Sequence, residues 1–172
     1  MKDVYLNPTP DRVVDNKMME MIADCVIGKV AGRRVLELGV GEQIWTPKLV
    51  DRFAEVTSVD GCQDLLAEMQ SRLSSHPEGS RWTPVHAYFE EYATERRFDT
   101  VFVTYVLEHV DDPGLIIKRA GRLWLEPGGL LVVVVPHALS LHRRLAVKMG
   151  LAKFPGELGE TDRRLGHKHC FT

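Results

Sequence analysis

Apolar runs alternate with amphipathic stretches along this chain, and the two patterns predict different elements. Short apolar runs predict strands at residues 33–38, 56–59, 83–88, 98–106 and 130–135. Apolar residues at helical spacing predict helices at residues 11–29, 47–53, 64–73, 113–125 and 138–149. Strands that alternate with helices indicate an α/β fold with a mostly parallel, doubly wound sheet. The run at 130–135 has no polar residue, which is typical of a strand covered on both faces.

Size and composition indicate a single globular domain. A chain of 172 residues can bury a substantial core, and a hydrophobic content of 44% is ordinary for a globular protein. Cys25, Cys62 and Cys170 show no paired spacing, which argues against a disulfide framework and fits a reducing compartment. The N-terminus has no signal-peptide pattern, and no apolar run is long enough to span a bilayer. We therefore expect a cytoplasmic protein.

Charge is unevenly distributed along the chain. Up to Pro136 there are 15 Lys and Arg against 21 Asp and Glu, whereas from His137 onward there are 7 against 3. This shift indicates that the tail faces an anionic partner, although a solvated helix face gives the same pattern. A phosphate or carboxylate could pair with the tail arginines, which are Arg143, Arg144, Arg163 and Arg164. The acidic domain disfavours nucleic acid, and the short apolar face of residues 138–149 disfavours membrane contact.

A glycine turn follows the first predicted strand. Gly39 and Gly41 lie between that strand and a helix that Thr46 and Pro47 are suited to begin, with Thr46 as its cap. Strand, glycine turn and helix together bring backbone amides and a helix N-terminus against a nucleotide-like ligand. A plain tight turn between strand and helix explains the same glycines, so the rest of the chain must decide.

A dinucleotide site is one interpretation of this turn. Its fingerprint has a third glycine three residues after the second, where this chain has Ile44. The acid Glu37 within the strand is also not a feature of that fingerprint. Both residues disfavour a nicotinamide-dependent oxidoreductase.

Four ordered motifs carry a resemblance to a known family. They are Glu37-x-Gly-x-Gly41, Asp60 at the end of the next strand, the segment 98–113 with its Leu-Glu-His, and the turn at 125–131. Together they resemble class I S-adenosylmethionine-dependent methyltransferases, of the ubiquinone-biosynthesis type that methylates small-molecule oxygens. The resemblance implies a Rossmann-like sheet of order 3-2-1-4-5 with S-adenosylmethionine as cofactor. It divides the chain into an N-terminal helix region (1–32), a cofactor-binding core (33–136) and a basic segment for substrate or partner (137–172).

The resemblance also implies the cofactor-binding positions. The glycines let the backbone approach the methionine part of the cofactor, and the Asp60 carboxylate accepts from both ribose hydroxyls. Glu37 accepts from the cofactor's ammonium group or orders the loop, and Thr104 offers its backbone. Gln43 stands where the family often has a third glycine. The full predicted set is Glu37, Gly39, Val40, Gly41, Asp60, Gly61, Cys62, Phe89, Glu90 and Thr104.

Methyl transfer to oxygen requires close alignment of donor and acceptor and gains from a base. His109 and His137 follow strands four and five at their carboxyl ends, so either could be this base, and Tyr105 could contact the acceptor. Some members of the resembled family bind a metal through Glu-x-x-Glu-His. Here Tyr105 replaces the first acid, so we assign no metal ligand. A hydrogen-bonded pair that shapes the loop is the alternative role for Glu108 and His109.

The predicted sheet is incomplete by comparison with the resembled family. Seven strands are expected there, whereas this chain gives five, and strands six and seven are absent. Strand five would then be an apolar exposed edge, which indicates a shortened chain, a product of proteolysis, or completion by a second chain such as a homodimer partner.

Two functions therefore compete. The first is methyl transfer to a small, anionic acceptor, with oxygen favoured over nitrogen or carbon; the second is a silent, cofactor-binding partner or regulator of an active relative.

Overall fold

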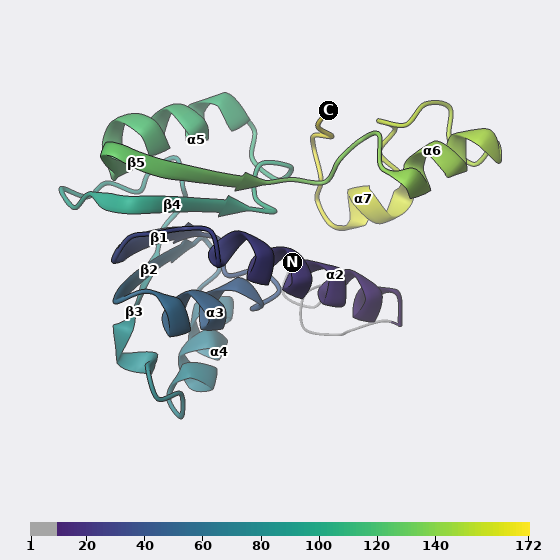
Figure 1. Cartoon of the computed structure of the whole chain (residues 1–172). Coiled ribbons are helices and arrows are strands. Elements are labelled where there is room, and N and C mark those ends of the chain that lie inside the picture. The colour runs from purple at the N-terminus through teal and green to yellow at the C-terminus, as the bar shows by residue number, and fades with distance from the viewer. Residues whose placement is uncertain (1–9) are drawn as a thin grey trace.

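Five parallel strands form one sheet with helices on both faces (Figure 1). The computed structural model describes residues 10–172, with side chains from Asn16 onward. The strands are β1 (Arg34–Leu38), β2 (Glu55–Asp60), β3 (Trp82–His86), β4 (Phe98–Thr104) and β5 (Leu125–Val134). The helices are α2 (Pro10–Ile27), α3 (Trp45–Arg52), α4 (Gln63–Leu73), α5 (Pro113–Arg119), α6 (Leu141–Lys148) and α7 (Glu160–Arg164). The strand order β3-β2-β1-β4-β5 confirms the predicted order.

The sheet separates two apolar cores. On one face α2, α3 and α4 cover a core that includes Leu49, Phe53 and Met69. On the other face α5 and the π-helical turn Ala120–Trp124 cover a second core that includes Trp124. The central strands β1 and β4 are buried between these layers, which explains why most of their residues are apolar.

Glu37 is the buried charged residue of β1, and a hydrogen-bonded network satisfies one of its two carboxylate oxygens. The hydroxyls of Thr46 (2.8 Å) and Ser58 (2.5 Å) donate to its Oε2 atom, and the indole of Trp82 donates to Ser58 (2.8 Å). The network therefore connects β1, β2, β3 and α3 in the centre of the domain. It also corrects the prediction for Thr46, which lies inside α3 and bonds Glu37, while Ile44 occupies the cap position.

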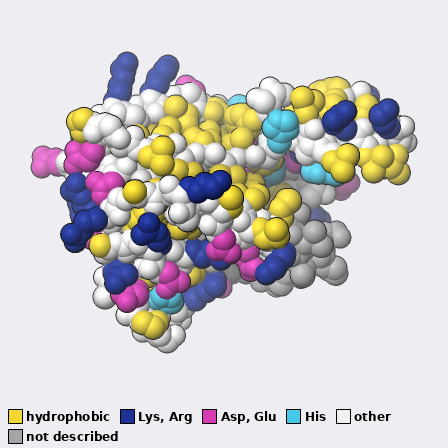
Figure 2. Space-filling model, viewed as in Figure 1, with side chains coloured by type: hydrophobic (Ala, Val, Ile, Leu, Met, Phe, Trp, Pro, Cys, Tyr) yellow, Lys and Arg dark blue, Asp and Glu magenta, His cyan; other side chains and the backbone are white. Residues whose placement is uncertain are grey.

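Strand β5 lies at the edge of the sheet in the described part of the chain, as the prediction of an exposed strand requires. The accompanying prediction that this strand is covered on both faces is wrong, because Leu130 is 47% exposed and Val133 is 41% exposed. Figure 2 shows hydrophobic side chains gathered on this side of the molecule. A second chain against β5 stays a prediction.

The segment after β5 forms a separate lobe beyond the carboxyl ends of the strands (Figure 1). It contains α6, which the sequence pattern predicted, and the short helix α7, which it did not predict. The chain then returns, and the Ala138 N–H donates to the Phe171 carbonyl (2.7 Å) beside the end of β5. No helix in residues 10–172 is long and apolar enough to cross a membrane, and the cytoplasmic location stays a prediction.

Candidate functional site

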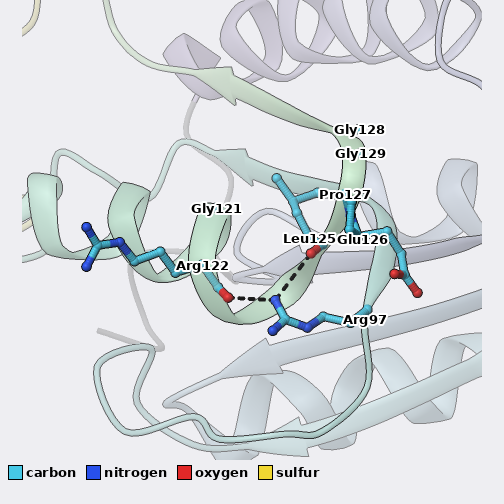
Figure 3. A pocket seen from close by; sticks show the side chains of 8 residues that line it. All are labelled: Arg97, Gly121, Arg122, Leu125, Glu126, Pro127, Gly128 and Gly129. Atoms are coloured by element: carbon cyan, nitrogen blue, oxygen red, sulfur yellow. Dashed lines mark hydrogen bonds between the residues drawn. The ribbon is translucent and has the colours of Figure 1, made fainter.

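One hollow lies where the strands begin and another where the strands end, and this difference decides which of them is the candidate site. The hollow in Figure 3 has a volume of about 490 Å³ and lies where β4 and β5 begin. Its Arg97 donates to the carbonyls of Arg122 (2.6 Å) and Leu125 (3.3 Å), so this cation stabilises the turn into β5. Ligands of doubly wound sheets bind at the opposite edge, where the strands end. The hollow in Figure 3 is therefore not the candidate site.

The second hollow lies at the carboxyl ends of β1, β2 and β4, and we call it the carboxyl-end pocket. Its volume is about 440 Å³. Nine predicted site residues line it, namely Gly39, Gly41, Asp60, Gly61, Cys62, Phe89, Glu90, Tyr105 and His109. Residues that lie up to 70 positions apart in the sequence thus meet in one place, as expected for strand-end positions of a parallel sheet.

Asp60 connects two of the turns that form this pocket. Its Oδ2 atom accepts from the Val40 N–H (2.9 Å), and its Oδ1 atom accepts from the Cys62 N–H (2.7 Å). The side chain is buried, which raises its pKa, while these backbone hydrogen bonds act in the opposite direction. Each carboxylate oxygen has two lone pairs, so each can accept from one further hydroxyl.

The glycine turn requires the backbone freedom of its first glycine. Gly39 has φ of +79°, and a Cβ atom there would lie 3.0 Å from Cγ2 of Val106. A side chain at this position would therefore be strained and crowded. The turn between β1 and α3 therefore requires glycine at position 39, and its contact with a ligand stays a prediction.

Two residues other than glycine adopt left-handed conformations beside this pocket. Gln43 has φ of +58° and Tyr105 has φ of +55°. Gln43 is buried and does not line the pocket, and its carbonyl accepts from Arg72 (2.9 Å). The turn of Tyr105 ends β4 at Thr104, two residues before the predicted end at Val106. Such strained residues concentrate at functional sites, and Tyr105 turns toward the pocket that it lines.

Four predicted site residues lie outside the lining of the carboxyl-end pocket. Val40 contributes through its N–H to Asp60, and Thr104 is buried within β4. Glu37 belongs to the buried network with Thr46 and Ser58, and its role toward the cofactor stays a prediction. His137 is exposed, and its Nδ1 atom accepts from the Leu139 N–H (3.1 Å). The structure does not bring His137 into the pocket.

Burial changes the acid–base behaviour of Glu37. Desolvation raises its pKa to about 7, although the hydroxyls of Ser58 and Thr46 oppose this shift. A carboxyl whose pKa is raised on folding stabilises the fold at low pH, and this contribution is lost as pH rises from the unfolded value of about 4.5 through about 7. Between pH 5 and pH 8, the free energy of unfolding of the unchanged protein should fall by roughly 1–3 kcal/mol more than that of Glu37→Gln.

Urea unfolding at several pH values tests this expectation. The Glu37→Gln profile should be flatter than that of the unchanged protein, because the amide is neutral throughout. Glu126→Gln, at a partly exposed glutamate paired with Arg34, is the control and should keep the original profile. Parallel profiles for the unchanged protein and Glu37→Gln would contradict the assignment.

The tail forms one wall of the carboxyl-end pocket. The Lys168 N–H donates to the Glu108 carbonyl (2.6 Å), and its ammonium group pairs with Asp111 (2.6 Å). A ring nitrogen of His169 lies 2.9 Å from the Val110 carbonyl. These contacts join residues about sixty positions apart, and they place Lys168 in the lining. Sequence reasoning missed several other lining residues, namely Leu65, Tyr88, Val106, Val110 and Asp111.

Burial also shifts the pKa values of Glu108 and His109, in the Leu-Glu-His segment beside this wall. The pKa of Glu108 is raised to about 7, mainly by desolvation. The pKa of His109 is lowered to about 4, again mainly by desolvation, so its ring is neutral at pH 7.

Of the tail arginines predicted to meet an anion, Arg143 instead donates to the Glu157 carbonyl (3.0 Å) and to Asp162 (2.8 Å).

Comparison with known proteins decides the family. The sequence model of a family described as methyltransferase domain matches residues 11–171. The chain belongs to this methyltransferase family. The resemblance identified from the motifs is thereby confirmed.

Named relatives of this methyltransferase domain include two curated proteins called ubiquinone biosynthesis O-methyltransferase. The one from Psychrobacter cryohalolentis is 34% identical over 108 residues, which cover 60% of this chain and 41% of the relative. The one from Bordetella avium is 32% identical over 124 residues, which cover 70% of this chain and 49% of the relative. The chain therefore spans less than half the length of these relatives.

Solved structures of other methyltransferases are similar to this chain. The CcbJ methyltransferase from Streptomyces caelestis is 30% identical with a TM-score of 0.60, over 75% of this methyltransferase domain and 53% of CcbJ. The glycopeptide N-methyltransferase MtfA in complex with S-adenosyl-L-methionine is 26% identical with a TM-score of 0.60, over 71% of this chain and 56% of MtfA. The predicted fold class is confirmed by these likenesses together with the strand order.

Proposed function

We propose that this chain binds S-adenosylmethionine in the carboxyl-end pocket and transfers its methyl group to an oxygen of a small molecule. The observation that carries the proposal is Asp60, a buried carboxylate at the end of β2 that faces the pocket and holds the glycine turn. Membership of the methyltransferase family and the cofactor complex of MtfA support the choice of cofactor. The names of the curated relatives support oxygen as the acceptor atom.

The pocket offers a suitable environment for each part of this cofactor. Asp60 retains lone pairs for two ribose hydroxyls, and the backbone at Gly39 and Gly41 leaves room for the methionine part. Cys62 and Phe89 provide apolar surface for the adenine. The acceptor then lies toward the wall that carries the side chains of Tyr105, His109 and Lys168.

Methyl transfer is an in-line displacement in which alignment supplies most of the acceleration. A lone pair of the acceptor oxygen forms the new bond to the methyl carbon while the carbon–sulfur pair stays on sulfur, which gives S-adenosylhomocysteine. The hydroxyl proton passes to a base, and His109 is our choice because its neutral ring lies at the pocket. The Lys168 ammonium lies in the lining and is paired with Asp111 (2.6 Å), and its remaining N–H donors favour an anionic acceptor.

A transfer assay tests the proposal. The chain is incubated with S-adenosylmethionine and a panel of catechols, phenols, carboxylates and amines, and products are identified by mass spectrometry. We expect S-adenosylhomocysteine and an O-methylated product, with anionic phenols or catechols preferred over neutral ones. Binding of S-adenosylhomocysteine without transfer to any acceptor would contradict catalysis and favour the silent partner. Methylation of amines alone would contradict the choice of oxygen.

A further inference from the structure

Two histidine rings meet beside the carboxyl-end pocket, and one of them comes from the tail. The ring of His109, in the loop after β4, meets the ring of His167 edge to face, with centroids 4.8 Å apart. One nitrogen of each ring and a carboxylate oxygen of Glu108 lie within 4.8 Å of one another. His109 lines the pocket, and His167 is not among the lining residues. His167 therefore acts on the pocket through its contact with His109.

The ring of His167 is held in place by Asp162. Its Nδ1 atom lies 3.2 Å from Oδ1 of Asp162, and the backbone N–H of His167 donates to the Asp162 carbonyl (2.9 Å). Arg143 of α6 donates to the same Oδ1 atom (2.8 Å). The three side chains are only 12–17% exposed, so water competes little with these charge-assisted bonds. Arg143 and Asp162 thus fix the ring that meets His109.

A backbone group of the tail also contacts the ring of His109. A backbone hydrogen bond with Gly166 raises the pKa of His109, against the larger effect of burial. A bond that favours the protonated ring is one in which the ring N–H donates, so the Gly166 carbonyl accepts. A Cβ atom at Gly166 would lie 3.8 Å from Nδ1 of His109, so this nitrogen faces the tail. Because a neutral imidazole has one N–H and one lone pair, the tail selects the tautomer whose lone pair is on Nε2.

We propose that His167 is a positioning residue which, together with Gly166, orients the His109 ring so that Nε2 accepts the proton of the methyl acceptor. The use of this lone pair on an acceptor rests on the proposed function, whereas the orientation of the ring does not. The acceptor O–H bond breaks, its proton moves to Nε2, and its electron pair forms the bond from oxygen to the methyl carbon. The carbon–sulfur pair stays on sulfur. Alignment of base and hydroxyl is required for this step, and the tail supplies it.

The groups around the ring also keep it neutral. Burial lowers the pKa of His109 to about 4, and the charges of His167 and Lys168 act in the same direction. The acids nearby are Glu108, with a pKa of about 7, and Asp111, which pairs with Lys168. His109 is therefore a neutral base above about pH 4 and loses this role as pH falls through that value. Removal of the His167 ring exposes His109 and removes one charge, so the pKa of His109 should rise toward its ordinary value of 6.5.

Nitrogen-15 NMR of the histidine rings tests the positioning without any acceptor. The His109 signals are assigned by their absence in His109→Gln. In the unchanged protein we expect one neutral tautomer, protonated at Nδ1, that stays mainly neutral down to about pH 5. In His167→Ala we expect both tautomers and a pKa for His109 that is at least ~1 unit higher. His169→Ala is the matched control, since its ring contacts the Val110 carbonyl, and His109 should keep its tautomer and pKa there.

Kinetics on the same samples separate positioning from binding. With the acceptor that the transfer assay identifies, His167→Ala should lower kcat at pH 7 by ~10-fold or more. KM for S-adenosylmethionine should stay within about twofold, because the lost interaction acts in the transition state. His167→Gln keeps a donor for Asp162 and lacks the ring, so it should show the same loss, and it replaces His167→Ala if thermal melting shows that the alanine variant is unfolded.

Two results would overturn the positioning role. One is an unchanged tautomer and pKa of His109 in both His167 variants, and the other is an equal change in His169→Ala, which would attribute the effect to general loosening of the tail. A chain that methylates no acceptor would contradict the proposed function, and the NMR result would still decide the orientation of the ring. Unchanged NMR signals with active transfer would contradict the positioning role alone.

Discussion

Replacement of Asp60 by alanine is expected to weaken binding of S-adenosylhomocysteine by at least ~100-fold. Hydrogen bonds to a charged group contribute about 1.5–3 kcal/mol each, and the proposed ribose contacts comprise two of them. A loss of about 3 kcal/mol corresponds to ~100-fold in the dissociation constant. The substitution also removes the acceptor of the Val40 and Cys62 N–H groups, so the two turns lose their common anchor. Calorimetric titration measures the affinity.

Asp99→Ala is the matched control for this experiment. The Asp99 carboxylate also accepts from two backbone N–H groups, those of Arg33 (2.7 Å) and Arg34 (2.9 Å). It lies near the start of β4, at the opposite end of the strands from the carboxyl-end pocket. We expect Asp99→Ala to lower the melting temperature and to retain the affinity. Unchanged affinity in Asp60→Ala would remove Asp60 from the ribose role, and an equal loss in Asp99→Ala would attribute the effect to stability.

Replacement of Gly41 by alanine is expected to weaken binding of the same ligand by at least ~10-fold. A Cβ atom at Gly41 has no protein atom within 4 Å, so the added methyl group disturbs no packing. Its φ of +30° makes alanine strained, at a cost of about 1 kcal/mol in stability. The methyl group would enter the space that we assign to the methionine part of the cofactor, because Gly41 lines the carboxyl-end pocket.

Gly128→Ala separates strain from obstruction. Gly128 also has positive φ, at +81°, and a Cβ atom there also has no neighbour within 4 Å. It lines the hollow of Figure 3, at the other edge of the sheet. Both variants should lose a similar, small amount of stability, and only Gly41→Ala should lose affinity. Tight binding by Gly41→Ala would show that the ligand does not approach this turn.

The sheet could be predicted from the sequence because its signals are local. Each buried strand is an apolar run, and each crossover helix has its own apolar face, so element order and chain direction follow without long-range information. The strand-end residues of the carboxyl-end pocket, such as Asp60 and His109, follow from the same reasoning, since parallel strands end at one edge. The α/β class was accessible in this way, whereas the strand order and most of the predicted pocket lining were implied by the resemblance to the methyltransferase family.

The remaining features depend on contacts between distant segments. Nothing near Glu37 in the sequence shows that Ser58 and Thr46 will converge on it, so its placement in a network could not be foreseen. The partners of the basic residues in the tail could not be foreseen for the same reason. The charge shift of the tail suggested an external anion, whereas Arg143 and Lys168 pair with Asp162 and Asp111 of the chain itself.

The convergence of Glu108, His109 and His167 beside the carboxyl-end pocket illustrates this limit. The sequence around His167 has little periodicity, and its distance of 58 positions from His109 gives no local signal for a shared site. Only the contact of the tail with the loop after β4 brings His167 to Glu108 and His109.

Calorimetric titration of the unchanged chain tests the central claim most directly, with S-adenosylhomocysteine in one experiment and a nicotinamide dinucleotide in another. The account predicts saturable binding of S-adenosylhomocysteine at one site per chain and no binding of the dinucleotide. Binding of the dinucleotide, with none of S-adenosylhomocysteine, would contradict the assignment of the carboxyl-end pocket.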